Sequence, residues 1–275
     1  MTLEDKLKKK TNDFNALHKT GDQWSLANYE IPSDYIGNKD HIDILLWGDV
    51  HLGSNYCDRT FAKESLDRTM DRGVYIIGMG DLLETATRDS IGAGVYQQDE
   101  IVQGQLEEME EWLKPHKDRI IGLLDGNHEH RLFISSGLNL TKILAKNVGT
   151  KYLGAGRLLR IRAGNQTYSV YITHGSSGAT LPYTKIKQCL NLQQYIDADC
   201  YCMGHVHALD SHSRAVHELD KRTRQVVENE KLFVLSGHYL NYFGSYAHRK
   251  GLIPSKKGSP VLKLYTDEKK IRVSI

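Results

Sequence analysis

The sequence has few cysteines and no long apolar run, and each of these absences excludes a class of protein. Its four cysteines, Cys57, Cys189, Cys200 and Cys202, are scattered over 275 residues, which is too sparse for a disulfide-stapled scaffold. No apolar stretch reaches the roughly 18 residues of a membrane-spanning helix. Residues 1–6 also lack the apolar core of a secretory signal. We therefore expect a cytoplasmic protein without a membrane partner.

The composition is that of a globular protein, with 40% apolar and 25% charged residues, and the chain is long enough to bury a sizeable core. Its net charge of +2 is unevenly distributed. From Gly237 to Ile275, eight Lys and Arg residues stand against two acidic ones, which gives +6 there and leaves −4 for the remainder. An anionic partner is therefore met more easily at the C-terminal end.

Five apolar stretches are each followed by polar residues of the metal-binding kind. Ile120 to Leu124 is the clearest, because Gly126-Asn127-His128-Glu129 follows it on what we expect to be a loop. The carboxyl ends of neighbouring parallel strands meet at one edge of a sheet, where α/β proteins bind ligands. The other four are Ile42 to Trp47 before Gly48-Asp49-Val50-His51, Val74 to Met79 before Gly80-Asp81, Tyr168 to Thr173 before His174-Gly175, and Cys200 to Met203 before Gly204-His205-Val206-His207.

Helices are predicted between these strands. Gly73 and Gly149 stand where a helix would end in a left-handed residue. A hairpin is predicted around residues 163–166, and residues 1–40 are expected to form a short helix and a loop. The predicted helices are Phe61 to Arg72, Gln97 to Leu113, Leu138 to Val148 and Thr184 to Ile196, and two short strands, Val261 to Tyr265 and Ile271 to Val273, close the chain.

Taken in order, the motifs resemble the full motif set of the calcineurin-like metallophosphoesterases, over residues 41–207 or about 60% of the chain. The resemblance implies an α/β fold of two packed mixed β-sheets flanked by helices, a sandwich of four layers. Residues 41–275 would form this domain, and residues 1–40 an N-terminal extension packed on it.

The resemblance also implies a role for each motif residue. Asp49, His51 and His207 would hold one divalent ion, Asn127, His174 and His205 a second, and Asp81 would bridge the two. Nitrogen and oxygen donors without a thiolate suit Mn²⁺, Fe or Zn²⁺ better than Ca²⁺, and we expect Mn²⁺. Two such ions can activate a hydroxide nucleophile and clamp phosphoryl oxygens.

His128 would be the catalytic histidine of the family, which steadies the transition state or protonates the leaving oxygen. The alternative is a histidine that caps a helix or holds Asp49 or Asp81 in place. Glu84 and Glu129 are interpreted as supporting residues outside the ligand set.

The substrate is less closely defined. Protein Ser/Thr phosphatases of this superfamily place an arginine just before Gly-Asn-His-Glu and another shortly after Gly-Asp. Here those places hold Asp125 and residues 82–86, although Arg88 or Arg131 could substitute. This departure favours a nuclease-like phosphodiesterase that acts on nucleotides or nucleic acid. The alternatives are a phosphomonoesterase and a non-catalytic metal-binding partner protein.

Residues 208–260 are expected to form a hairpin and a loop that handles substrate or forms an interface. The loop interleaves aromatic rings with basic residues, a pattern suited to stacking on bases and following phosphates. A packed loop or a subunit contact in a homo-oligomer is the equal alternative. The candidate substrate-binding residues here are Tyr239, Tyr242, Arg249 and Lys250.

Overall fold

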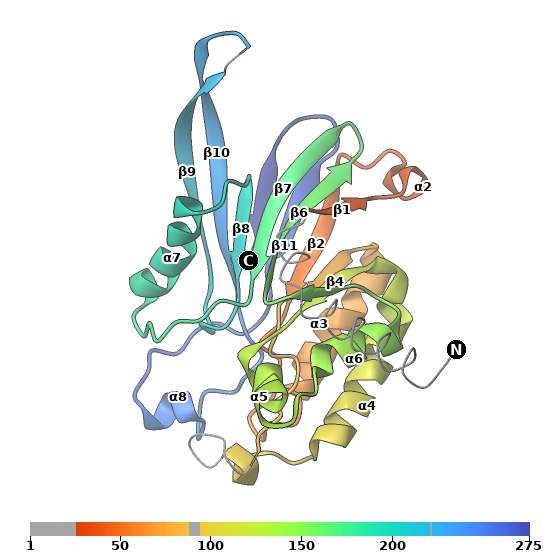
Figure 1. The fold of residues 1–275 in the computed structure, drawn as a ribbon, viewed down its shortest axis with the longest axis vertical. Helices are drawn as coiled ribbons and strands as arrows, with labels where there is room; N and C mark the ends of the chain where they lie inside the picture. Colours follow the sequence, from red (N-terminus) through yellow and green to blue (C-terminus); the bar gives the residue numbers. More distant parts are fainter. Residues whose placement is uncertain (1–25, 88–93, 221) are drawn as a thin grey trace, which may run out of the picture.

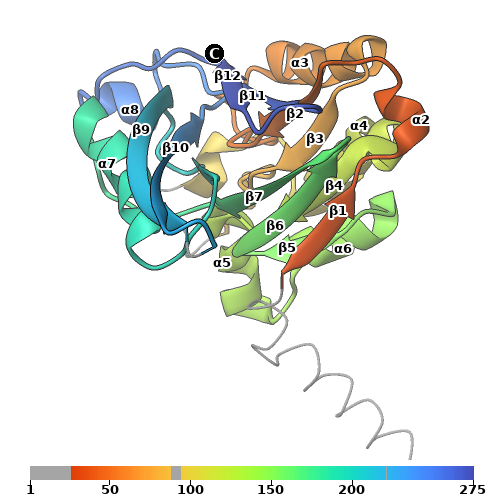
Figure 2. The ribbon, with the colours of Figure 1, turned by 90° about the horizontal axis from the view of Figure 1, so that it is seen from above.

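The computed structural model describes residues 26–87, 94–220 and 222–275. Two six-stranded mixed sheets pack face to face, with helices on their outer faces (Figures 1 and 2). In order, sheet A contains β1 (Ala27–Glu30), β6 (Gly156–Ala163), β7 (Gln166–Thr173), β8 (Cys200–Met203), β10 (Gln225–Ser236) and β9 (Leu209–Asp220). Sheet B contains β12 (Ile271–Ser274), β11 (Val261–Tyr265), β2 (His41–Trp47), β3 (Tyr75–Gly78), β4 (Ile120–Leu124) and β5 (Tyr152–Gly154).

The core strands are buried on both faces, which explains their continuous apolar sequences. In β2, Ile44 and Leu46 point into the layer between the sheets, while Leu45 and Trp47 point toward the helices outside sheet B. β2, β3 and β4 are parallel to one another, and so are β7, β8 and β10. Each sheet therefore presents three parallel carboxyl ends, and the predicted motifs follow five of these six.

Several helix ends follow local signals that the sequence shows. α3 begins after Asp58, whose side chain accepts a hydrogen bond from the Phe61 N–H, and it ends at Gly73 in the left-handed conformation. In the same way, α6 begins after Asn139, whose side chain accepts from the Lys142 N–H, and ends at Gly149 in the left-handed conformation. The helices are α2 (Ser33–Ile36), α3 (Arg59–Arg72), α4 (Val102–Leu113), α5 (Asn127–Ser136), α6 (Leu140–Val148), α7 (Pro182–Asn191) and α8 (Tyr246–Arg249), with 3₁₀ turns at Gly94–Gln97, Lys114–Arg119 and Leu192–Gln194.

Some predicted boundaries were wrong. The helix expected from Gln97 begins at Val102, because Gln98 instead bonds through its side chain to the backbone of Ala86. The helix expected to reach Ile196 ends at Asn191 and continues only as a 3₁₀ turn. The loop expected after Gly126 is the first turn of α5.

The N-terminal segment contributes a strand that the sequence analysis did not predict. β1 pairs in parallel with β6 at one edge of sheet A, and Ile31 beyond it is buried in the core. The part of the predicted extension that covers residues 1–25 lies outside the described residues. None of the described helices is both long and apolar enough to cross a membrane.

Candidate metal centre

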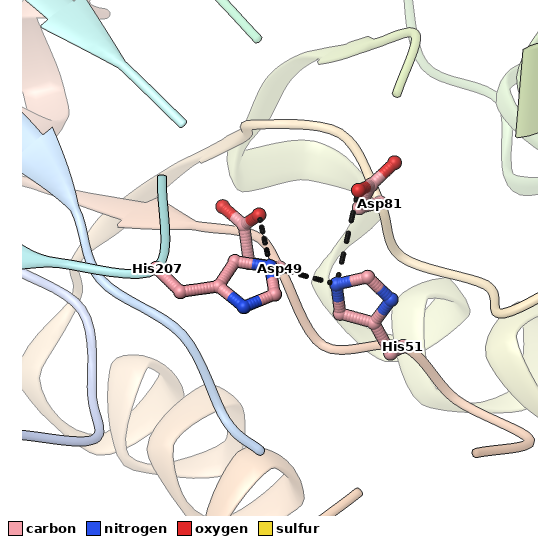
Figure 3. Close-up of side chains that lie close together, drawn as sticks. All are labelled: Asp49, His51, Asp81 and His207. Atoms are coloured by element: carbon pink, nitrogen blue, oxygen red, sulfur yellow. Dashed lines mark hydrogen bonds and ion pairs between the residues drawn. The ribbon is translucent and has the colours of Figure 1, made fainter. Parts of the chain in front are cut away.

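Three groups of side chains at the carboxyl ends of the parallel strands could hold a metal ion. One consists of His51, Glu84 and His128, and Asp81 belongs to both of the others. In each group, the ligating atoms lie within 4.8 Å of one another. The first of the two groups that share Asp81 is Asp49, His51, Asp81 and His207, shown in Figure 3. The second is Asp81, His174 and His205, beside which the Asn127 amide oxygen also lies.

The atoms that face one another in these groups are mostly electron-pair donors. His51 Nε2 lies 3.1 Å from His207 Nε2, and His207 Nε2 lies 3.3 Å from Asp49 Oδ1. In the second group, Asn127 Oδ1 lies 3.0 Å from His174 Nε2 and 2.7 Å from His205 Nδ1. A neutral imidazole has one N–H group and one nitrogen with a free lone pair. Where two such atoms face each other, at most one of them carries a proton, so each group has lone pairs that point toward a common site. Divalent cations fit this donor set.

Neighbouring groups fix which atom of each ligand is free. His174 Nδ1 donates to the Met79 carbonyl at 2.9 Å, and His51 Nδ1 lies 3.1 Å from Glu84 Oε2, so the Nε2 atom of each ring points into the centre. Asp81 Oδ1 accepts from the His128 N–H at 2.9 Å. Its Oδ2 is thereby left toward both groups, 3.2 Å from His174 Nε2 and 3.7 Å from His51 Nε2.

Backbone strain is concentrated at the same residues. Seven described non-glycine residues have a positive φ, and five of them are predicted ligands. A non-glycine residue in this conformation costs of order 1–3 kcal/mol and persists where the surroundings impose it, often at functional sites. The five are Asp49 at 49°, His51 at 54°, Asp81 at 49°, His205 at 69° and His207 at 47°.

A glycine brings α5 against Asp81. A Cβ atom at Gly126 would lie 2.1 Å from the Asp81 nitrogen and 2.2 Å from Asp81 Oδ1. Any side chain at this position would push the first turn of α5 away from the carboxylate. The motif glycine is therefore needed for the close approach that positions His128 N–H and Asn127.

Burial and charge keep the carboxyl groups ionised. Asp49 and Asp81 are at most 1% exposed. Burial opposes the charged form of Asp81, but the charges of His174 and His128 outweigh it and hold the Asp81 pKa well below its usual range. The pKa of Asp49 is lowered against the same burial by its hydrogen bond to His207. The centre is thus anionic at its base, which suits cation binding.

His128 and Glu84 form a connected pair beside the first group. His128 Nδ1 lies 3.0 Å from the Glu84 carbonyl oxygen and 3.4 Å from Glu84 Oε2, while its Nε2 faces Asp81 Oδ2 at 3.9 Å. Burial opposes the charge on Glu84, but hydrogen bonds to His128 and His51 lower its pKa. Glu84 therefore orients both a candidate ligand and the candidate catalytic histidine.

His238 is a residue of the centre that the sequence analysis did not select. Its ring stacks on His207, with centroids 5.4 Å apart and planes at 23°. Its Nδ1 accepts from the Leu240 N–H, and burial, followed by the charge of His207, lowers its pKa to about 3. Gly237-His238 directly follows β10, in the same way that Gly204-His205 follows β8. The signal was therefore present in the sequence.

The candidate substrate-binding residues have different surroundings. Arg88 lies outside the described residues. Arg131 is half-buried, one helical turn after Asn127, and no hydrogen bond or ion pair to a described residue is found for it. Tyr239 is fully buried, with its ring 5.6 Å from Phe61 and 6.3 Å from Trp47. Its ring is core material and offers no face to a base, contrary to the expectation.

The rest of the aromatic and basic loop is partly held by the fold. Tyr242 donates its hydroxyl to the Leu252 carbonyl, and Arg249 donates to Tyr56 Oη and to the Gly244 carbonyl. Lys250 is exposed, and its ammonium lies 5.8 Å from the centre of the Tyr246 ring. Of the candidates in this loop, Lys250 is the one whose charge is not already hydrogen-bonded to another described residue.

Replacing Asp81 by Asn should remove most of the bound metal. Because both groups share this carboxylate, we expect the variant to lose both ions. Substitution of a residue that belongs to one group should mainly weaken the binding of the ion in that group. Elemental analysis of dialysed protein measures the ion content. Asp125→Asn is the matched control, because Asp125 is a neighbouring carboxylate that accepts from Tyr152 Oη instead. Two ions retained per chain in Asp81→Asn would contradict the shared role.

Glu84→Gln should weaken metal binding without abolishing it. The variant keeps the size of the side chain but removes the charge that orients His51, and losses of a supporting group are typically about 10–100-fold in affinity. Competition with a metal-binding dye gives the affinity. Glu107→Gln, on the exposed surface of α4, should leave it unchanged. An unchanged affinity in Glu84→Gln would show that His51 needs no such support.

No family model and no curated protein matches this sequence. Among solved structures, the chain is similar to a Vps29 single mutant from Entamoeba histolytica, at 14% identity and TM-score 0.39 over 85% of this chain and 97% of that one. A conserved uncharacterized protein of Streptococcus pneumoniae, described as a predicted phosphoesterase, gives 12% identity and TM-score 0.35 over 81% and 82%. These scores are low, and the assignment of the fold rests instead on strand order and motif placement. The structure confirms the predicted α/β fold of two packed mixed sheets flanked by helices, and it brings the motif side chains together as the resemblance to the calcineurin-like metallophosphoesterases implies.

Proposed function

We propose that this protein is a metal-dependent phosphodiesterase that acts on nucleotides or nucleic acid, with Mn²⁺ as the preferred ion. The observation that carries the proposal is the pair of ligand groups joined by Asp81. When bound, divalent ions lower the pKa of water toward 7 and offset the charge of a phosphoryl group. The chain's own residues must then orient the ester, hold a proton for the leaving oxygen and keep the centre charged.

His128 is suited to the proton transfer. Its Nδ1 is occupied by Glu84, which leaves Nε2 on the side of the ligand groups. A proton held at Nε2 can pass to the departing oxygen. The His128 side chain is 15% exposed, so a substrate can reach it while bulk water has limited access.

The surroundings of the centre favour a diester over a monoester. Where the protein phosphatases carry arginines, Asp125 is bound to Tyr152 Oη, and Leu82, Leu83 and Ala86 are buried. A monoester dianion would find no guanidinium at these positions. A diester has one charge fewer on its phosphate and needs less compensation.

Besides Lys250, two basic residues without an ion-pair partner among the described residues are candidates to contact a diester. Arg131 lies on the same face of α5 as Asn127 by helical spacing. Lys185, in the first turns of α7, is half-buried without an ion-pair partner among the described residues, and burial lowers its pKa. The helix α7 packs against β10, the strand that leads to His238. We assign both to the phosphate backbone of the substrate.

A panel of substrates on metal-loaded protein tests the proposal. We expect kcat/KM for bis-p-nitrophenyl phosphate to exceed that for p-nitrophenyl phosphate by about tenfold or more, a difference of roughly 1.4 kcal/mol in transition-state binding. Single- and double-stranded DNA and RNA and cyclic nucleotides then define the class. Asp81→Asn controls for a contaminating hydrolase. Faster cleavage of the monoester would make the protein a phosphomonoesterase, and no cleavage of any ester would leave a binding protein.

His128→Ala should separate chemistry from metal binding. We expect kcat to fall by roughly 10²–10⁴ with the metal content unchanged. The loss should be smaller for a p-nitrophenolate leaving group, which needs no proton, than for a nucleotide ester. His130→Ala is the matched control, because His130 is an exposed residue of the same helix. If the variant instead loses metal, His128 belongs to the ligand set.

A further inference from the structure

β9 is an edge strand of unusual length. Among the described strands, the other three sheet edges are β1, β12 and β5, with four, four and three residues, whereas β9 has twelve. β10 is the one described strand that pairs with it, in continuous register from Leu209 to Asp220. β9 contains no proline. Natural proteins usually shorten or interrupt such edges, because the free N–H and C=O groups accept another strand.

No layer of the described structure covers the outer half of the β9–β10 hairpin, although Glu230 forms an ion pair with Arg272 on β12. We call residues 215–220 and 225–230 the distal ribbon, which extends beyond the body of the molecule in Figure 1. All six residues from Gln225 to Glu230 are exposed, whereas the next six, Lys231 to Ser236, are buried. Leu219 and Val226, opposite each other, are 63% and 69% exposed. An isolated two-stranded ribbon is marginally stable in water, so the distal ribbon benefits from a partner.

The sequence of β9 is self-complementary in charge about Val216. If two β9 strands lie antiparallel with Val216 opposite Val216, residues whose numbers sum to 432 face each other. Arg214 then meets Glu218, and His212 meets Asp220, each pair occurring twice by symmetry. These side chains alternate with period two and share one face of the strand. Opposite charges directly across a strand pair, such as Arg214 and Glu218, stabilise it.

Neighbouring registers weaken this match. A shift by two residues keeps the same face and moves the symmetry axis by one residue, to Ala215 or to His217. With the axis at Ala215, Arg214 faces Val216 and Asp210 faces Asp220, and like charges directly opposite are destabilising. With the axis at His217, Arg214 faces Asp220, but Glu218 faces Val216 and loses its partner. The charge pattern therefore favours the register centred on Val216, which pairs both Arg214 and Glu218.

Arg214 also has no ion-pair partner among the residues that the structure describes. It lies directly opposite Lys231 on β10, so that two positive side chains face each other across the strand pair. The Lys231 ammonium is already bound to Asp197 at 2.7 Å and lies 3.5 Å from Glu218. The repulsion between Arg214 and Lys231 is therefore offset on the Lys231 side alone, and no described carboxylate lies against the Arg214 guanidinium. The Glu218 carboxylate of a second copy would relieve this repulsion.

We propose that two copies of this chain pair through the outer edges of β9, antiparallel about Val216, and join their two A sheets into one. The twofold symmetry makes the contact isologous, with the same residues contributed by both copies. The partner is a second copy because β9 complements itself. The contact lies at the opposite end of β10 from His238, so the proposal does not depend on the proposed function.

The mass in solution and a charge exchange test the pairing. We expect light scattering to give twice the 31.2 kDa of one chain. Arg214→Glu and Glu218→Arg should each yield monomers, because each places two like-charge pairs in the interface. An equimolar mixture of the two variants should restore a dimer that contains one chain of each, and the double variant R214E/E218R should dimerise by itself. A monomeric wild-type protein, or dimers that persist in both single variants, would overturn the proposal.

A cross-link tests the register even if a charge variant folds poorly. Val216→Cys places two thiols opposite each other at the axis, so mild oxidation should give a disulfide-linked dimer in high yield on a non-reducing gel. Ala215→Cys is the control, since residue 215 faces residue 217 of the other copy and should cross-link far less. The wild-type protein measures the background from its native cysteines. Equal cross-linking at positions 215 and 216, or none at 216, would contradict the register.

Discussion

A buried carboxylate, Asp81, is the constraint on which the centre depends. It is 1% exposed and ionised, and burying an unpaired charge is costly unless partners surround it. Its partners come from both sheets and from a helix: His51 after β2, His174 after β7, and the first turn of α5 through the His128 N–H. A helix N-terminus favours a negative charge. The two sheets must therefore pack with their ligand-bearing edges aligned.

This requirement explains features that would otherwise weaken the fold. Five ligand residues have a positive φ, which is unfavourable for side chains of this size. Gly126 leaves the start of α5 without a side-chain cap so that the helix can reach Asp81. Glu129, in the same turn, is buried with one oxygen accepting from the Leu83 N–H and the other without a partner among the described residues. Burial, then the charge of Asp81, raises its pKa to about 8. The strain is concentrated where the surrounding layers are rigid enough to hold it.

The sequence predicts the five motif strands and the ligand clusters well, because strands buried on both faces are continuous apolar runs that end at polar motifs. It predicts α5 poorly, since the polar first turn of this helix gives no apolar periodicity and resembles a loop. Tyr239 shows a different limit. An aromatic residue beside basic ones has the same pattern whether its ring stacks on a ligand or fills the core, and contact with Trp47 and Phe61 decides between them. β1 was missed because its alternation extends over four residues, which is too short to stand out in the sequence.

β10 connects the two parts of the molecule to which we assign roles. Its exposed half belongs to the distal ribbon, and its buried half leads to His238 beside His207. At about 3.3 Å per residue, the six buried residues separate the ribbon from the centre by roughly 20 Å. Side-chain contacts cannot span that distance, so charge changes on β9 should act on the centre only through the rigidity of sheet A. Because β10 is held by β8 along its buried half, the sheet remains intact when the ribbon has no partner. Metal binding by one chain therefore requires no second copy.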